Sequence, residues 1–286
     1  DKTTDGYSFG GLNQLDPKQA YLFICNHRDI ALDPAMVNLA LHTVGLDTVR
    51  IAIGDNLLSK PFASDLIRVN RSFIVKRSVE GRREKLEALK QLSAYIRHSV
   101  TADKASCWIA QAEGRAKNGD DRTETALLKM LTLSKSKQQT FGEAIGELKL
   151  MPVSISYEYD PCIVEKTQEL YAASQGDDYI KSEFEDLDCI QKGFLGYKGR
   201  IQVNFGDVVS AQFESAEDLA EEINRQITGR ICDYHFAPTE TSKNNLLKES
   251  INSKNIIVTG NTVIDALMYT VQKLKKNKSL MNLNTY

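Results

Sequence analysis

The sequence predicts an α/β fold with a mainly parallel central sheet, helices on both faces and a helical C-terminal extension. Short apolar runs of strand length are separated by stretches with helical periodicity, and strands that alternate with helices are typical of parallel sheets. The chain has 286 residues, of which 42% are apolar, enough for one large domain and an appended piece. We expect a main domain over residues 1–230 and a helical extension over 231–286 packed on it.

The first apolar run, residues 21–25, has the length and bulk of a buried strand. It ends in the polar sequence Asn-His-Arg-Asp at residues 26–29. Asp33 and Pro34 then predict a helix start, since Asp is a favoured N-cap and Pro suits the first helical position. A histidine, His27, therefore lies at the carboxyl end of a strand, where ligands and chemistry collect in α/β sheets.

The remaining elements follow in order along the chain. Residues 1–20 are expected to form an entry loop. Further strands are predicted at 48–54, 72–76, 106–110, 151–157 and 200–205, the last of them at an edge of the sheet. Helices are predicted at 80–98, from about 122, within 164–192 with a break at Gly176, from the capping box at 215–218 to Gly229, and at 263–276. Residues 237–255 indicate a linker or a weak helix.

Charge and cysteine content exclude several classes of protein. A net charge of −2 does not favour a nucleic-acid binder, which would carry a basic excess. The five cysteines are scattered and form no Cys-x-x-Cys pair, so neither a disulfide framework nor a zinc site is predicted. No run approaches the ~18 apolar residues of a membrane-spanning helix, and no signal peptide is visible.

Polar clusters follow three of the predicted strands: residues 26–29, Lys76-Arg77, and Glu113-Gly114-Arg115 with Lys117 and Arg122. Because parallel strands end on the same side of a sheet, we expect these clusters to converge. His27 is a candidate general base, and both Asp29 and Asp33 are near enough along the chain to orient it. The alternative is a loop histidine beside an aspartate that only caps a helix.

The other two clusters suit an anionic ligand. Guanidinium groups bind phosphate oxygens in a forked geometry, and Gly114 allows a close approach of the backbone.

These residues resemble the glycerolipid acyltransferase superfamily, which includes the 1-acylglycerol-3-phosphate and glycerol-3-phosphate acyltransferases, and a bacterial branch of it in particular. Four motifs are similar and in the same order: Asn26-His27 with Asp33, the strand 73–77 ending in Arg77, residues 112–115, and the strand around Pro152. Five residues rather than four separate His27 from Asp33, which keeps Asp29 as a rival partner. The third motif lacks its Thr.

The resemblance implies an O-acyltransferase of phospholipid synthesis. It would move a fatty acyl chain from acyl-CoA or acyl carrier protein to the free hydroxyl of 1-acylglycerol-3-phosphate or a related phospho-acceptor, without a metal or other cofactor. His27 would be the general base, in a dyad with Asp33 or Asp29. The residues implied in substrate binding are Asn26, Arg28, Arg77, Glu113, Gly114 and Arg115.

The resemblance also implies a cytoplasmic protein, peripheral at the inner face of the cell membrane. The basic stretch 273–278 of the last predicted helix suits a membrane surface, although a helix packed on the domain with a solvated basic end explains it as well. Three alternatives stay open: transfer to a different acceptor, a thioesterase, and a catalytically inactive lipid-binding relative.

Overall fold

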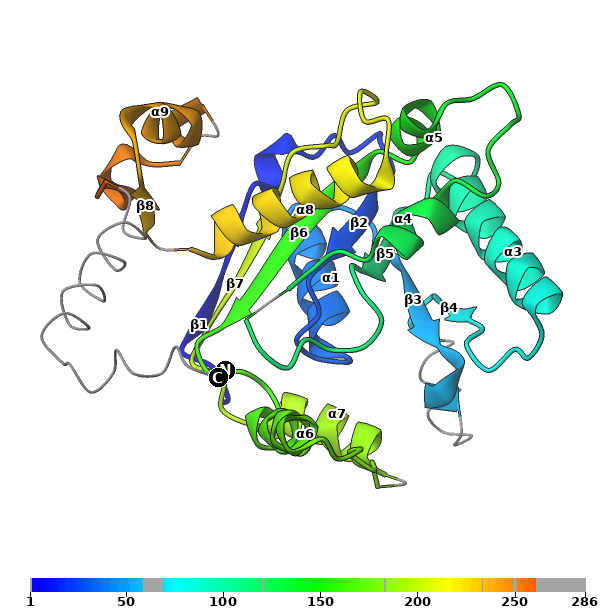
Figure 1. Ribbon diagram of the computed structural model, residues 1–286, viewed down its shortest axis with the longest axis horizontal. Coiled ribbons are helices and arrows are strands. Elements are labelled where there is room, and N and C mark those ends of the chain that lie inside the picture. The colour runs from blue at the N-terminus through cyan, green and yellow to red at the C-terminus, as the bar shows by residue number, and fades with distance from the viewer. Residues whose placement is uncertain are drawn as a thin grey trace, which may run out of the picture. The chain divides into compact units, whose positions relative to one another are not determined.

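The computed structural model describes residues 2–58, 69–119, 121–182, 184–232, 234–248 and 251–260. The chain divides into two compact units, Asp1–Ile231 and Cys232–Tyr286. Figure 1 shows the elements of both units, many of them labelled.

The described strands of the first unit share a single sheet. They are β1 (Gly6–Gly10), β2 (Leu22–Cys25), β3 (Arg50–Gly54), β4 (Ser72–Val75), β5 (Cys107–Ala110), β6 (Leu150–Tyr157) and β7 (Arg200–Phe205). The helices are α1 (Leu32–Thr43), α3 (Arg82–Thr101), α4 (Thr125–Leu131), α5 (Phe141–Glu147), α6 (Ile163–Gln175), α7 (Glu185–Leu195) and α8 (Ala216–Ile231). Short 3-10 turns, η1 (Leu12–Gln14) and η2 (Asp55–Leu58), follow β1 and β3.

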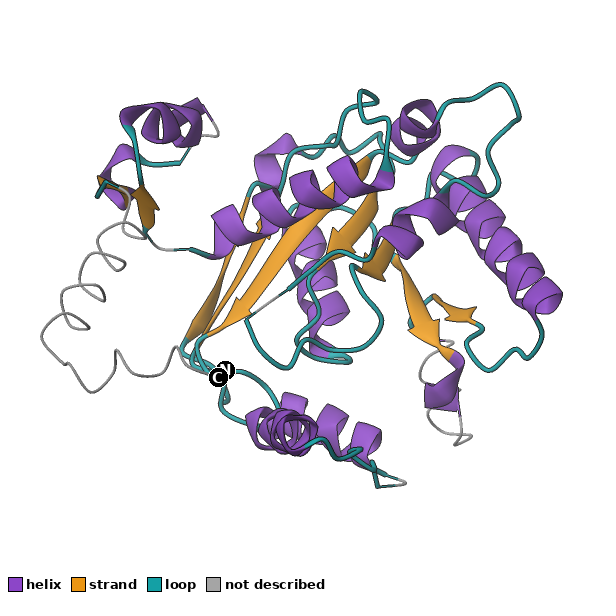
Figure 2. Ribbon diagram, in the orientation of Figure 1, coloured by secondary structure: helices purple, strands orange, loops and turns teal. Residues whose placement is uncertain are grey.

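The sheet order is β1-β7-β6-β2-β5-β3-β4. Neighbouring strands are parallel except β6 and β7, which are antiparallel. The predicted fold class, a mainly parallel sheet flanked by helices, is therefore confirmed. In Figure 2 the strands cross the middle of the unit, with helices beside them.

Two expectations about the sheet edge are wrong. Residues 200–205 do form a strand, but β7 lies between β6 and β1 rather than at an edge. The reason is that the expected entry loop contains β1, whose residues 6–10 pair in parallel register with 200–204. The sequence of β1 is rich in glycine and polar residues, which hides a strand from any reading of apolar runs.

Two hydrophobic cores cover opposite faces of the sheet, because successive side chains of a strand point to opposite sides. On one face, Leu22 and Ile24 of β2 belong to a cluster with buried residues of α3, α4 and α8. On the other face, Phe23 and Cys25 belong to a cluster with buried residues of α1. Residues 22–25 are thus buried on both sides, as the continuous apolar run predicts.

The helix ends follow local rules in the first unit. Thr140 and Glu143 form a reciprocal capping box at α5. Ser215 accepts from the backbone N–H of Asp218, as the predicted box before α8 requires. The helix then continues past Gly229 to Ile231, so the predicted stop at that glycine is wrong. A glycine inside a helix costs only about 1 kcal/mol, which the buried apolar face of α8 offsets.

The described part of the second unit is β8 (His235–Ala237), α9 (Glu240–Lys248), the turn η3 (Ser253–Asn255) and β9 (Ile256–Val258). The two strands pair in parallel. The extension expected to be helical therefore also contains two strands, and of the linker or weak helix expected within 237–255 the helix is present. The helix predicted at 263–276 and the basic stretch 273–278 lie outside the described residues. The expected packing of this unit on the first stays a prediction.

Candidate functional site

The imidazole of His27 is held by a buried carboxylate. Its Nδ1 lies 2.9 Å from Oδ2 of Asp33, a residue in the first turn of α1 that is 0% exposed. The same Oδ2 accepts the backbone N–H groups of Arg28 at 2.6 Å and Asp29 at 2.9 Å. Oδ1 accepts the hydroxyl of Tyr157 at 2.8 Å. Four donors therefore fix this carboxylate in one orientation, and with it the imidazole ring.

Asp33 rather than Asp29 contacts His27. The sequence predicts that Asp33 caps the helix that follows, whereas in the structure Asp29 does so. Asp33 lies inside α1, and the N-cap position is Ala31, which has no capping side chain. Instead Oδ1 of Asp29 accepts the backbone N–H groups of Ala31 at 2.9 Å and Leu32 at 2.8 Å. Asp29 thus provides the cap, and Asp33 is left to bind the imidazole.

The other oxygen of Asp29 is buried against α7. Oδ2 has no hydrogen-bond partner among the described residues, and a Cβ built on Gly193 would lie 2.3 Å from it. Burial, and next the charge of Asp33, raise the pKa of the Asp29 carboxyl. Asp29 is therefore a structural group that favours its protonated form more than an ordinary aspartate does.

His27, Arg77 and Arg115 line one cavity of about 120 Å³ at the carboxyl ends of the parallel strands. These three residues come from three segments that are distant in sequence, and their convergence is what the strand-end clusters predict. The side chain of His27 is 15% exposed there. Since Nδ1 is bonded to Asp33, Nε2 is the nitrogen left to accept a proton from a ligand.

The cavity carries an excess of positive charge. Its lining includes Arg77, Arg115 and Lys181 against the single carboxylate of Asp186, counted over the described residues. Arg77 is partly exposed and lies 3.5 Å from Glu113, measured between Nη1 and Oε1. Nη1 of Arg115 is buried without a partner among the described residues, which leaves a donor available to an anion. A phosphate group suits this lining.

Gly114 also lines the cavity and has a φ of +79°, a conformation that favours glycine. The next residues are tied to the histidine loop, because the backbone N–H of Ala116 donates to the carbonyl oxygen of His27 at 2.8 Å. The third predicted cluster is therefore held directly against the first. Glu113 lines the adjoining apolar cavity rather than the one at His27.

Asn26 and Arg28, both expected to bind substrate, make structural contacts. The amide of Asn26 is buried and exchanges hydrogen bonds with the backbone of Ile155 in β6, at 3.0 and 2.8 Å. Arg28 pairs with the carboxylate of Asp121 at 2.9 Å and with that of Asp160 at 3.5 Å. These contacts favour a positioning role for the two residues, in which they hold the histidine loop against β6 and the loop around residue 121.

An apolar cavity of about 350 Å³ adjoins the polar one. The two share the lining residues Ala52, Gly54, Arg77 and Ala110. Eight of its twelve other lining residues are apolar, among them Leu89, Leu92, Ile109, Leu127 and Met130, and the four charged ones are Lys76, Lys85, Glu113 and Glu124. The volume is in the range of small-molecule sites. The lining therefore changes from cationic at His27 to mainly apolar beyond Arg77.

Several residues of the site were missed in the sequence. Trp108 packs edge-on against the His27 ring, with centroids 5.8 Å apart, and Tyr157 bonds Asp33. Both lie in strands that the sequence predicts, but nothing in a strand pattern marks them as site residues. Asp186 of α7 accepts from Asn56 at 3.4 Å and pairs with Lys181 at 3.2 Å, so it joins two segments across the cavity. No local signal distinguishes these charges from a solvated helix face.

Comparison with known proteins identifies two regions. A model of the family described as acyltransferase matches residues 7–156, more than half of the chain, which contain His27, Arg77 and Arg115. This match confirms the family resemblance seen in the sequence. Among solved structures, the 1-acyl-sn-glycerophosphate (LPA) acyltransferase of Thermotoga maritima is 12% identical, with a TM-score of 0.45 over 77% of this chain and 68% of that chain.

The second region was not identified in the sequence analysis. A model of the family described as UDP-N-acetylglucosamine 2-epimerase matches residues 209–285. The enzyme of that name from Neisseria meningitidis is 66% identical over 55 residues, 19% of this chain and 15% of its own. The one from Yersinia pestis is 52% identical over 103 residues, 36% of this chain and 27% of its own. The chain thus spans only about one seventh of the length of the Neisseria meningitidis enzyme.

Among the described residues, no helix combines the length and apolar character needed to cross a bilayer.

Proposed function

Because this chain belongs to the acyltransferase family, we propose that it transfers a fatty acyl group from a thioester to the free hydroxyl of a phosphate-bearing acceptor lipid of the 1-acylglycerol-3-phosphate type. The observation that carries the proposal is the shared cavity of His27, Arg77 and Arg115, which joins a base to an anion site. The donor is acyl-CoA or acyl carrier protein.

The proton transfers follow from the dyad. Nε2 of His27 takes the proton of the acceptor hydroxyl as its oxygen attacks the thioester carbonyl, and Asp33 stabilises the imidazolium that forms. A new carbon–oxygen bond forms and the carbon–sulfur bond breaks. The imidazolium then returns the proton to the leaving thiolate. No covalent acyl-enzyme is needed, because the acceptor itself is the nucleophile.

The two cavities divide the substrates between them. Arg77 and Arg115 hold the acceptor phosphate near His27, which places the free hydroxyl next to the base. The adjoining apolar cavity, reached past Arg77, receives a fatty acyl chain. Such an acceptor resides in a bilayer, so the proposal places the protein at the inner face of the cell membrane, as a peripheral cytoplasmic enzyme.

The test is a panel of acyl thioesters and lysophospholipid acceptors, assayed with purified wild type and with His27→Ala. Loss of a general base lowers turnover by about 10²–10⁴-fold. His98→Ala is the matched control, since His98 is an exposed histidine that pairs with Asp103 and lines neither cavity. Acceptor binding should survive in His27→Ala.

The outcomes separate the alternatives. Thioester consumption that depends on added lysophosphatidate supports the proposal. Consumption without any acceptor identifies a thioesterase, and a phosphate-free acceptor that is used with a kcat/KM as high as that for lysophosphatidate identifies a different substrate class. Acceptor binding with no turnover by wild type identifies a lipid-binding relative. Each of the last three results overturns the proposal.

The epimerase-like region adds a separate candidate, nucleotide-sugar binding by the second unit. Its strands β8 and β9 with helix α9 form a single β-α-β segment. The stretch that matches the Neisseria meningitidis enzyme covers 15% of that enzyme's length. Isothermal titration with UDP-N-acetylglucosamine decides this candidate, and it does so independently of the acyl-transfer assay.

A further inference from the structure

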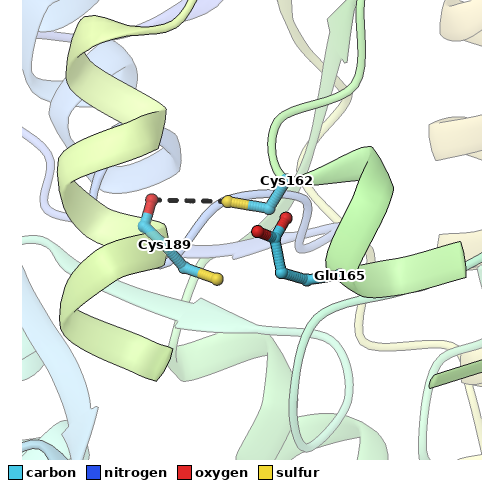
Figure 3. Close-up of side chains that lie close together, drawn as sticks. All are labelled: Cys162, Glu165 and Cys189. Carbon is cyan, nitrogen blue, oxygen red and sulfur yellow. Dashed lines mark hydrogen bonds between the residues drawn. The ribbon is translucent and has the colours of Figure 1, made fainter. Parts of the chain in front are cut away.

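A cluster of metal-ligand side chains lies beside the cavity, between α6 and α7. It consists of Cys162, Glu165 and Cys189, whose ligand atoms all lie within 4.8 Å of one another. Figure 3 shows Cys162 and Glu165 at the start of α6, facing Cys189 of α7. We propose that these three residues bind a divalent cation of the Zn²⁺ class.

The backbone aims the three side chains at one point. Glu165 is three residues after Cys162, which places both at the same side of the first turn of α6. Cys162 itself has a φ of +56°, which is unusual for a residue with a side chain. Its Sγ lies 3.4 Å from the carbonyl oxygen of Cys189, so the two helices are already in contact at the proposed ligands.

The donor set matches zinc chemistry. Thiolate sulfur and carboxylate oxygen are both ordinary Zn²⁺ ligands, and three protein ligands leave a fourth tetrahedral position for water. Hard cations such as Mg²⁺ and Ca²⁺ prefer sites made of oxygen alone, so two sulfurs disfavour them.

Two cations already flank the cluster and balance part of its charge. Lys192 forms an ion pair with the carboxylate of Glu165. Nη2 of Arg115 lies 3.5 Å from Sγ of Cys189, an N–H···S contact of the kind that supports a thiolate ligand. Two thiolates and one carboxylate carry three negative charges, and a divalent cation with Lys192 and Arg115 brings four positive ones, so the occupied cluster would carry a net charge of only +1.

Arg115 links this site to the cavity of His27, which it also lines. A cation on Cys189 would fix the sulfur that Arg115 contacts, and thereby fix the guanidinium for its anion. That consequence rests on the proposed function, whereas binding of the cation does not.

No metal site is predicted from the sequence, because Cys162 and Cys189 are 27 positions apart and form no Cys-x-x-Cys pair. Only the packing of the start of α6 against α7 brings them together.

The test uses the purified full chain, reduced and stripped of metal with a chelator, then dialysed against ZnCl₂. We expect about one equivalent of zinc per chain by elemental analysis, with a Kd measured by competition against a chromophoric chelator. Substitution of Co²⁺ should give sulfur-to-metal charge-transfer absorption. Loss of a residue that only hydrogen-bonds to a metal ligand lowers metal affinity by about 10–100-fold. Cys189 and Glu165 are proposed as direct ligands, so Cys189→Ser or Glu165→Gln should weaken zinc binding by at least about 100-fold.

Cys232→Ser is the matched control, because Cys232 is exposed and outside the cluster. Circular dichroism of each variant without metal shows that it folds, and Glu165→Gln keeps both thiols if a cysteine variant does not. The proposal is overturned if wild type retains no more zinc than Cys189→Ser, or if Cys232→Ser loses zinc equally. A Cys162–Cys189 disulfide found by peptide mapping in protein that takes up no zinc would overturn it as well.

These outcomes are distinct from failure of the acyl-transfer proposal. Zinc stoichiometry and Co²⁺ absorption need no substrate and no turnover. If zinc binds and no acyl transfer is found, the metal site stands and the proposed function fails.

Discussion

Replacement of Asp33 by Asn tests the dyad most sharply, because the structure dictates how an amide would sit. Oδ2 of Asp33 accepts two backbone N–H groups as well as His27, so an oxygen must stay at that position. The amide nitrogen is then turned toward the hydroxyl of Tyr157, which can accept a hydrogen bond. The Asn variant therefore keeps the geometry of the ring and loses only the negative charge.

The expected fall in kcat of Asp33→Asn follows from that geometry. In a serine hydrolase triad, Asn in place of Asp imposes the wrong histidine tautomer and costs about 10⁴-fold in kcat. Here an oxygen still faces Nδ1 of His27, so the tautomer is retained. A hydrogen bond to a charged group contributes about 1.5–3 kcal/mol, which converts to a fall in kcat of about 10- to 150-fold.

The assay is steady-state release of free thiol from an acyl thioester at varied acceptor concentration. We expect kcat to fall and the KM for the acceptor to stay within about twofold, since Asp33 does not line the cavity. Tyr157→Phe is the control: it removes a partner of Asp33 but not the charge, and should cost less than about 10-fold. The reasoning is refuted if Asp33→Asn leaves kcat unchanged, or loses as much as His27→Ala.

Three further predictions follow from the site. Arg77→Ala should raise the KM for a phosphate-bearing acceptor by about 10- to 150-fold, with little change in kcat, and steady-state kinetics with acceptors that lack the phosphate should show no such effect. Asp29→Asn keeps the oxygen that caps α1. Because the pKa of Asp29 is raised in the folded state, the free energy of unfolding of wild type should fall relative to that of the variant as pH rises from about 4 to 8. Urea unfolding across that range measures the difference, and a difference that does not change with pH would contradict the prediction. Ala126→Leu narrows the apolar cavity, so the ratio of kcat/KM for long over short acyl donors should fall, whereas Ala173→Leu on the exposed side of α6 should leave that ratio unchanged.

The sequence by itself determined strands β2 to β7 and the polar clusters that follow three of them. The runs at residues 22–25, 107–109 and 150–155 are buried, and the short-range sequence pattern is enough to recognise them. Parallel strands end on one side of a sheet, so the fold class predicts that His27, Arg77 and Arg115 lie along the same edge. That they share one cavity also required the strand order, which places β2, β5, β3 and β4 next to one another.

Only the tertiary structure decided between the two aspartates. Asp29 and Asp33 are both close to His27 along the chain, and the choice depends on how the first turn of α1 presents its carboxylates. The place of β1 beside β7 and the meeting of Cys162 with Cys189 were equally beyond the sequence. Each depends on contacts between segments far apart in the chain, and such contacts are set by packing, which leaves no periodic signal in the residues themselves.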